Sequence, residues 1–476
     1  MIQRLTIFKN YPYLLYLVIL LFVLLFILST GFNGLYGQDG HEYLRYTERL
    51  IHFFKTGQNP GDYFWPLYYP LLGALFSVLF NPIFSLQLIS VFSMILSFFY
   101  LERILLLLFS DEPNIIRKYL ILFFVLCPFV LRASVVVMSD MLCLFFIVAS
   151  VYHFLKYLKE QKNNQLMVMI VFSVSAMMTR YAAIIVLLIP IFYAGILFIR
   201  KVDFKTIFLI FLITIILITP HVFVKTDHPT AFLHHTWLQR WSLEHFFSLN
   251  FNTEEGNYHY SFPNFLYVFF HFIHPGFLFP GFALLFAIRK KDFAERDIKI
   301  LLLLTIVYAL FLCGIPFQNL RFLLLTFPFV LILLFPAFMR IYKQFSTNHI
   351  RMKIILIAIV VIQLSLFIRA FHPFYKLNVL EKEIAGRILK YPSKTIYTFS
   401  IDGALKSYGV NNKLINMWDT KINEPELKSL ILFNESAFAE EYKSKSPMLN
   451  WQFIKEKYHL QKKESLREGW ELYEIQ

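Results

Sequence analysis

Runs of about 20 consecutive apolar residues recur along most of this chain, and they constrain its fold more than any other feature. A helix of about 20 such residues crosses the ~30 Å hydrocarbon core of a bilayer. Only 16% of the residues are charged and 58% are hydrophobic, whereas soluble proteins carry about 25% charged residues. The sequence therefore predicts a polytopic all-α membrane protein, and it argues against a soluble enzyme, a disordered chain or a secreted disulfide scaffold.

Basic residues gather beside every second apolar run, as in Arg200–Lys201 and Arg289–Lys291. The positive-inside rule puts such loops in the cytoplasm, so the N-terminus is expected inside. The net charge of +14 comes mostly from these flanking residues, and nucleic acid is therefore not expected as a partner. A bacterial inner membrane is the simplest location. About eleven spans are predicted: 11–30, 83–109, 119–138, 141–158, 166–178, 181–199, 204–219, 264–288, 300–315, 322–339 and 354–371.

Two segments between the first and second runs do not fit a full span. From His41 to Lys55, apolar and aromatic residues share one helical face and charged residues the other, a pattern typical of a helix that lies in the membrane interface. Gly57 is expected to end this helix. Pro66 to Phe80 is apolar but only about 15 residues long, so it is expected to be re-entrant.

The composition changes at about His372, after which charges are frequent and no further span is expected. We predict a transmembrane domain over residues 1–371 and a soluble α/β domain outside the cytoplasm over residues 372–476. A domain of ~100 residues is of ordinary size. Short strands are expected at 394–399, 413–418, 427–433 and 470–475, with a helix at 449–459.

Acidic residues lie at the outer ends of predicted spans, where a charge at membrane depth costs about 2.5–3.5 kcal/mol and needs a reason. Asp39 precedes Glu42 in the first outer loop, and Asp140 follows Ser139 in the second. Asp39 could act as a general base. Asp140 could orient an acceptor, hold a divalent cation or share the base role. The alternative is that both are helix caps, with Asp39 and Glu42 as a capping box.

Two arginines, Arg180 and Arg321, lie on the same predicted outer side. The guanidinium group is planar and always charged, which suits it to phosphate. A lipid-linked phosphate is one interpretation, and interaction with lipid headgroups is the other. Nothing comparable is expected on the inner side, where the charges are mostly the Lys and Arg residues that orient the chain.

The order of these features resembles the GT-C superfamily of membrane glycosyltransferases. It is similar to the bacterial branch related to protein O-mannosyltransferases and the aminoarabinose transferase of lipid A. The resemblance covers about residues 1–340. It rests on the segments Asp39-Gly40-His41-Glu42-Tyr43, Trp65-Pro66-Leu67-Tyr68-Tyr69-Pro70-Leu71-Leu72-Gly73, Ser139-Asp140, Thr179-Arg180-Tyr181 and Asn319-Leu320-Arg321-Phe322.

The resemblance implies a polyprenyl-phosphate sugar donor, inversion at the sugar, and an acceptor outside the cytoplasm, whether glycan, lipid or protein. It makes Asp39 the base and Asp140 the second-loop acid. It implies substrate contacts for Arg180, for Arg321 as a weaker candidate, and for the neighbours of the base, His41, Glu42 and Tyr43. Many relatives have an adjacent Asp-Glu pair, whereas Gly40 follows Asp39 here, so the metal requirement stays open.

A transporter or flippase of lipid-linked sugars is the main alternative. Transporters favour charges near the membrane midplane and related halves of the chain. This chain shows no internal repeat, and its acids lie at the ends of spans. Transfer of a sugar is therefore the favoured function.

Overall fold

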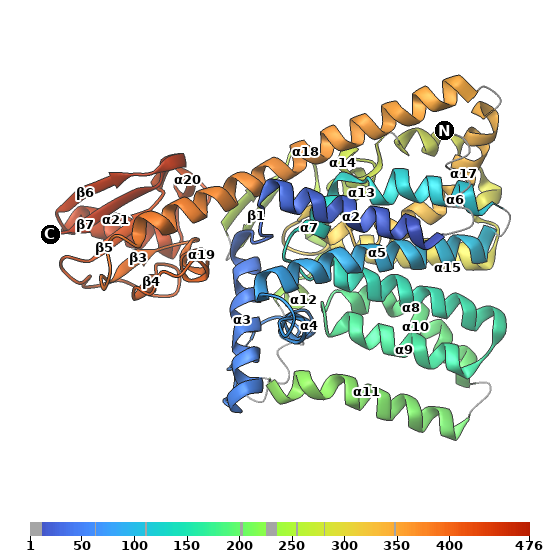
Figure 1. The fold of residues 1–476 in the computed structure, drawn as a ribbon, viewed down its shortest axis with the longest axis horizontal. Coiled ribbons are helices and arrows are strands. Elements are labelled where there is room, and N and C mark those ends of the chain that lie inside the picture. Colours follow the sequence, from blue (N-terminus) through green and yellow to red (C-terminus); the bar gives the residue numbers. More distant parts are fainter. Residues whose placement is uncertain are drawn as a thin grey trace.

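The computed structural model describes residues 12–61, 63–109, 112–199, 203–224, 236–253, 256–279, 281–346 and 349–476. A bundle of apolar helices leads into a small C-terminal sheet (Figure 1). Within these residues, six helices are long and apolar enough to cross a membrane, or seven if one bent pair is a single span. The predicted helical membrane architecture is thus confirmed, whereas the number of eleven spans is not.

The bundle is built around α8, which packs against α5, α9 and α10. Its interior is a single large cluster of buried aliphatic and aromatic side chains. The long apolar helices are α2 (Pro12–Thr30), α5 (Pro82–Phe109), α8 (Asp140–Glu160), α11 (Phe204–Val224), α17 (Phe327–Phe345) and α18 (His349–Ile388). The shorter ones are α9 (Asn163–Met177), α10 (Ala183–Ile199) and α15 (Arg296–Cys313).

Several predicted spans are broken, because proline cannot continue the helix before it. The span predicted at 119–138 bends by 68° between two helices, and Pro128 begins the second. The span predicted at 264–288 divides at Pro275. The pieces are α6 (Pro113–Leu120), a π-helical turn (Ile121–Val125), α7 (Pro128–Val135), α13 (Asn264–Phe272), α14 (Pro275–Leu278) and a 3-10 helix (Gly281–Ala287).

Smaller elements complete the bundle region. The span predicted at 322–339 begins with a separate turn, α16 (Leu320–Leu323), before α17. The others are α12 (Thr236–Gln239), 3-10 helices at Leu243–Phe246 and Lys290–Phe293, and the hairpin of β1 (Asn250–Thr253) and β2 (Gly256–His259).

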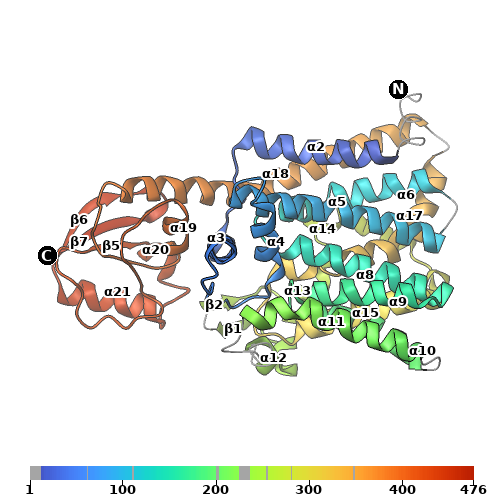
Figure 2. The same ribbon diagram turned by 60° about the horizontal axis from the view of Figure 1, so that its bottom comes forward.

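The predicted interfacial helix is α3 (Gly37–Thr56), and the short apolar segment after it contains α4 (Tyr68–Phe76). Helix α3 lies across the ends of the bundle helices, between the bundle and the C-terminal sheet (Figures 1 and 2). It buries Tyr43, Tyr46 and Leu50. It ends at Gly57 as predicted, because the φ of 74° there is a left-handed conformation that glycine adopts without strain.

The C-terminal part forms one mixed sheet with strand order β4-β3-β5-β7-β6. The four predicted strands and the predicted helix are present, but strand β6 was not predicted. Its sequence, LQKKES, is largely polar, as is common for a strand at the edge of a sheet. The elements are β3 (Ile396–Thr398), α19 (Asp402–Ser407), β4 (Leu414–Asn416), β5 (Leu430–Phe433), α20 (Glu435–Phe438), α21 (Ser446–Lys457), β6 (Leu460–Ser465), a 3-10 turn (Arg467–Gly469) and β7 (Glu471–Ile475).

Helix α18 links the two parts without interruption and runs beyond residue 371 as far as Ile388. The last residues of this helix belong to the hydrophobic core of the C-terminal part. The predicted domain boundary between residues 371 and 372 therefore falls inside a continuous helix. The organisation into two domains stays a prediction.

Candidate active site

Asp39 lies in the first turn of α3, where the partial positive charge of the helix N-terminus favours an acid. The expected capping box is not formed. Tyr36 is the N-cap residue, and no side chain caps the helix. Glu42 pairs instead with Arg45, and Asp39 directs its carboxylate away from its own helix.

Asp140 begins α8 and is almost completely buried, with 3% of its side chain exposed. The alternative of a helix cap fails here too, because the N-cap residue Ser139 makes no side-chain capping bond. The Asp140 carboxylate accepts a hydrogen bond from Arg180, which lies in the turn before α10.

Arg321, in α16, joins the two acids into one network. Its Nη2 donates to Asp39 Oδ2 at 2.5 Å, and its Nε lies 3.9 Å from Asp140 Oδ1. Acids and arginines thus alternate in the order Asp39, Arg321, Asp140, Arg180. The Nε of Arg321 is buried and has no hydrogen-bond partner among the described residues.

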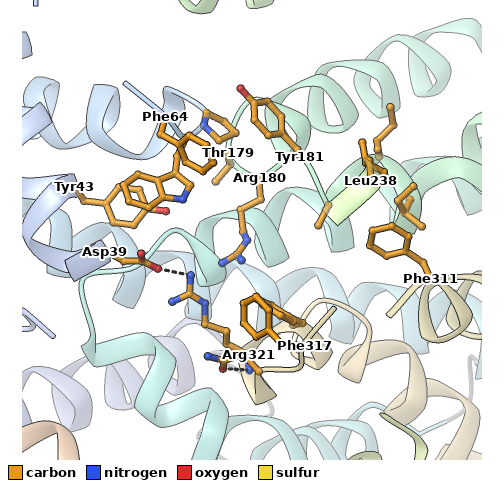
Figure 3. Close-up of a pocket in the computed structure, with 17 residues that line it drawn as sticks. Asp39, Tyr43, Phe64, Thr179, Arg180, Tyr181, Leu238, Phe311, Phe317 and Arg321 are labelled. Atoms are coloured by element: carbon orange, nitrogen blue, oxygen red, sulfur yellow. Dashed lines mark hydrogen bonds and ion pairs between the residues drawn. The ribbon is translucent and has the colours of Figure 1, made fainter. Parts of the chain in front are cut away.

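The network borders a cavity of about 260 Å³. Arg180 and Arg321 approach each other from opposite sides, and Asp39 lies beside Arg321 (Figure 3). The described residues form no hydrogen bond with the second oxygen of Asp39, Oδ1. Asp140 does not line the cavity, but it lies next to Arg180 and Arg321, which do. Aromatic side chains complete the wall: Tyr43, Phe64, Trp65, Tyr181, Phe311, Phe317 and Phe322.

Tyr43 faces the same cavity from the buried side of α3. Its hydroxyl lies 2.7 Å from Ser139 Oγ, which ties α3 to the start of α8. Burial, and secondarily the charge of Asp39, raises the pKa of Tyr43, so the phenol stays protonated and able to donate.

His41 and Glu42, also predicted to bind substrate, lie on another face of α3. The ring of His41 is held between Glu381 Oε2, 3.2 Å from Nε2, and Ser407 Oγ, 2.9 Å from Nδ1. Both side chains border a second cavity toward the C-terminal part. The structure therefore brings together Asp39, Tyr43, Arg180 and Arg321, with Asp140 behind them, and separates His41 and Glu42 from this group.

Three residues near the network were not singled out from the sequence for a role. Trp65 lies in the wall of both cavities. Glu381 is far from His41 in sequence, and no local pattern connects the two. Arg132 is stacked between Phe129 and Phe374, with its guanidinium carbon 4.7 and 4.5 Å from the ring centres. Its position inside the apolar run predicted at 119–138 was the available signal, because a charge there needs a reason.

No group of three or more His, Cys, Asp or Glu side chains that could hold a metal ion occurs among the described residues. Arg321 contacts Oδ2 of Asp39, and Arg180 contacts Oδ1 of Asp140. The cation role suggested for Asp140 stays a prediction.

Solved structures share this fold over its whole length. ArnT from Cupriavidus metallidurans, in a crystal structure bound to undecaprenyl phosphate, superposes with a TM-score of 0.65 at 12% identity and covers 97% of both chains. Its apo form gives the same score and covers 98% of both chains. An oligosaccharyltransferase of Archaeoglobus fulgidus scores 0.48 at 11% identity, covering 98% of this chain and 74% of its own.

No curated protein matches the chain in sequence. The model of the Alg9-like mannosyltransferase family, however, matches residues 11–398, which include both the bundle and α3. The resemblance to GT-C membrane glycosyltransferases is thus confirmed. The chain belongs to the Alg9-like mannosyltransferase family.

Proposed function

We propose that this protein transfers a sugar from a polyprenyl-phosphate donor to an acceptor outside the cytoplasm, with Asp39 as the general base. One observation carries the proposal: a carboxylate with a free oxygen and two arginines line the same cavity. The undecaprenyl phosphate bound to ArnT, which has the same fold, supports a lipid-linked phosphate as the donor class.

The chemistry requires a base and a stabilised leaving group. The acceptor hydroxyl gives its proton to Asp39 Oδ1 while its oxygen forms the new bond to the sugar C1. The bond between C1 and the phosphate oxygen breaks, and polyprenyl phosphate leaves with its electron pair. Arg180 and Arg321 stabilise the charge on that phosphate, a role of fixed donors that is usually a large part of catalysis. A single displacement of this kind inverts the sugar.

The aromatic wall and the location of the cavity support a substrate that is part lipid. Asp39 and Tyr43 of α3 line the cavity, and α3 lies at one end of the bundle (Figure 1). A polyprenyl chain can stay among the apolar helices while its phosphate reaches the arginines. We propose that this end faces the periplasm of a bacterium, with the N-terminus in the cytoplasm, as the distribution of Lys and Arg suggests.

Release of polyprenyl phosphate from a panel of polyprenyl-phosphate sugars, by purified protein in nanodiscs, tests the proposal. Asp39→Asn keeps the size of the side chain but not its basicity, so turnover should fall by about 10²–10⁴-fold. Asp419→Asn, at an exposed position of the C-terminal part, is the matched control and should behave as wild type.

Near-normal turnover by Asp39→Asn would show that another group is the base. Tight binding of every donor without release by wild type would favour a transporter of lipid-linked sugars instead.

A further inference from the structure

A second cavity, of about 500 Å³, lies between α3 and the C-terminal part. Gln38, His41 and Glu42 border it from α3, whereas Asp402 and Lys406 border it from α19. Neither the proposed base nor the donor arginines line it. The cavity therefore exists only because the C-terminal part is docked against the helix that carries Asp39.

The two cavities share one residue, Trp65. This indole is half-buried and packs on Tyr43, with ring centres 5.6 Å apart. Tyr43 lines only the first cavity. Trp65 therefore forms the partition between the donor site and the second cavity, and it presents an aromatic surface to each.

Most residues that line the second cavity carry a charged or polar side-chain group. It contains three acidic and three basic side chains together with amides, a hydroxyl and an imidazole. Carboxylates only accept hydrogen bonds, and guanidinium and ammonium groups only donate them. A wall that offers both in equal number suits a ligand rich in hydroxyl groups, each of which donates and accepts. A polyanion would need an excess of basic side chains, which this cavity does not have.

Some of these groups are free to bind a ligand. Glu48 and Lys406 form no hydrogen bond or ion pair with the described residues, although both border the cavity. The amide of Asn416 accepts from Trp418 N at 2.8 Å through its oxygen, which leaves its two N–H donors available. The free groups come from three different elements, α3, α19 and β4, so they surround the cavity.

We propose that the second cavity binds the saccharide part of the acceptor, with Trp65 as the platform that separates acceptor sugar from donor sugar. This inference rests on the proposed transfer reaction and specifies its acceptor class. Asp39 lies between Gln38 and His41 in sequence, within one helical turn of the cavity wall. In the proposed complex the sugar extends one hydroxyl past Trp65 toward Asp39, and one turn of helix rises only about 5.4 Å along its axis.

Kinetics of the full-length protein in nanodiscs, with its preferred donor, test the assignment. The acceptor panel contains methyl glycosides of glucose, mannose and N-acetylglucosamine, a serine- and threonine-containing peptide, and a phospholipid. Glu48→Gln and Lys406→Met each remove one charged partner of a hydroxyl. Each should raise the KM for the accepted glycoside by about tenfold or more, with kcat within about twofold.

Trp65 gives a second test that does not depend on charge. Trp65→Ala should lower kcat/KM for the glycoside by about tenfold or more, and Trp65→Phe, which keeps an aromatic face, should recover most of it. Glu440→Gln and Lys443→Met, both at exposed positions of the same C-terminal part, are the matched controls and should change neither KM nor kcat.

Transfer to the peptide or the phospholipid but to no glycoside would overturn the saccharide assignment. An unchanged glycoside KM in Glu48→Gln and Lys406→Met would overturn the role of the cavity. Both results leave release of polyprenyl phosphate intact, whereas failure of the transfer reaction itself would abolish release in wild type.

Discussion

Buried ion pairs lie at both ends of the helical bundle, and the two ends differ in what surrounds them. At the end with α3, Asp39, Arg321, Asp140 and Arg180 alternate beside a cavity and leave Oδ1 of Asp39 and Nε of Arg321 unused. At the opposite end, Glu102 and Asp292 are also buried, with 4% and 5% of their side chains exposed.

The acids at the opposite end are fully engaged. Glu102 accepts from Arg117 Nε at 2.8 Å and from the hydroxyl of Tyr16. Asp292 binds Arg340 through both oxygens, at 2.7 and 2.6 Å. Neither acid lines either cavity described above. A buried ion pair is thus weak evidence for a site, and free donors and acceptors beside a cavity are the better indication.

Replacing one arginine at each end of the bundle should separate a role in turnover from a role in stability most clearly. Arg321→Met takes away the partner of Asp39 and a donor to the leaving phosphate, so turnover should fall by about 10²–10³-fold. Arg340→Met leaves Asp292 buried without its charged partner, which should cost about 3–5 kcal/mol of stability. Donor release per folded molecule and thermal unfolding in nanodiscs measure the two effects.

Turnover in Arg340→Met, corrected for the folded fraction, should match wild type. A comparable loss of turnover in both variants would mean that the two ends do not differ as the contacts indicate.

Asp140→Asn should have an intermediate effect, because Asp140 touches the arginines and not the cavity. Loss of its charge frees Arg180 and loosens Arg321, so the donor phosphate is held in a poorer geometry. We expect the donor KM to rise and kcat to fall by about tenfold, clearly less than for Asp39→Asn. Steady-state kinetics with varied donor check this, and an effect as large as that of Asp39→Asn would make Asp140 a direct participant.

His41 offers a smaller test, since it joins α3 to the C-terminal part through Glu381 and Ser407. His41→Ala should speed hydrogen exchange in the first turn of α3 and reduce turnover a few-fold, because Asp39 is then held less firmly. His41→Gln, which can keep one of the two hydrogen bonds, should recover part of both. Unchanged exchange in His41→Ala would show that other contacts alone dock the helix.

Loss of an ion pair that is exposed and borders no cavity should have the smallest effect on the protein. Glu426 pairs with Lys413 at the surface of the C-terminal part, and the hydrogen bond from Lys413 lowers the pKa of Glu426 from its ordinary 4.5. The pair therefore stabilises the folded state above about pH 4.5, and this contribution is lost as the pH falls through the lowered pKa. The difference in Tm between wild type and Glu426→Gln should be small at pH 7 and should shrink in acid.

Hydropathy and charge predicted the features that are determined by residues close together in the sequence. The apolar runs, the interfacial helix, its end at Gly57 and four of the five C-terminal strands are present as predicted. The breaks at Pro128 and Pro275 were not predicted, because apolar composition continues across them. The same composition rule counted each run as one span.

The sequence predicted the individual residues of the site but not the contacts between them. Sidedness and motif order brought Asp39, Asp140, Arg180 and Arg321 onto one side, but no local pattern reveals that Arg321 bridges the two acids. Nothing comparable was expected at the end opposite α3, yet Glu102 and Asp292 are buried there in ion pairs with arginines. The partner of each lies well away in sequence, on another element, so only the tertiary fold reveals these pairs.

The continuity of α18 has a mechanical consequence. A helix of 40 residues is about 60 Å long, and this one begins in the bundle and ends in the core of the C-terminal sheet. The sheet therefore cannot shift sideways unless the helix tilts or bends, and Pro373 is the point where bending is easiest. The distance between the sheet and the far end of the bundle is therefore set by the length of this helix.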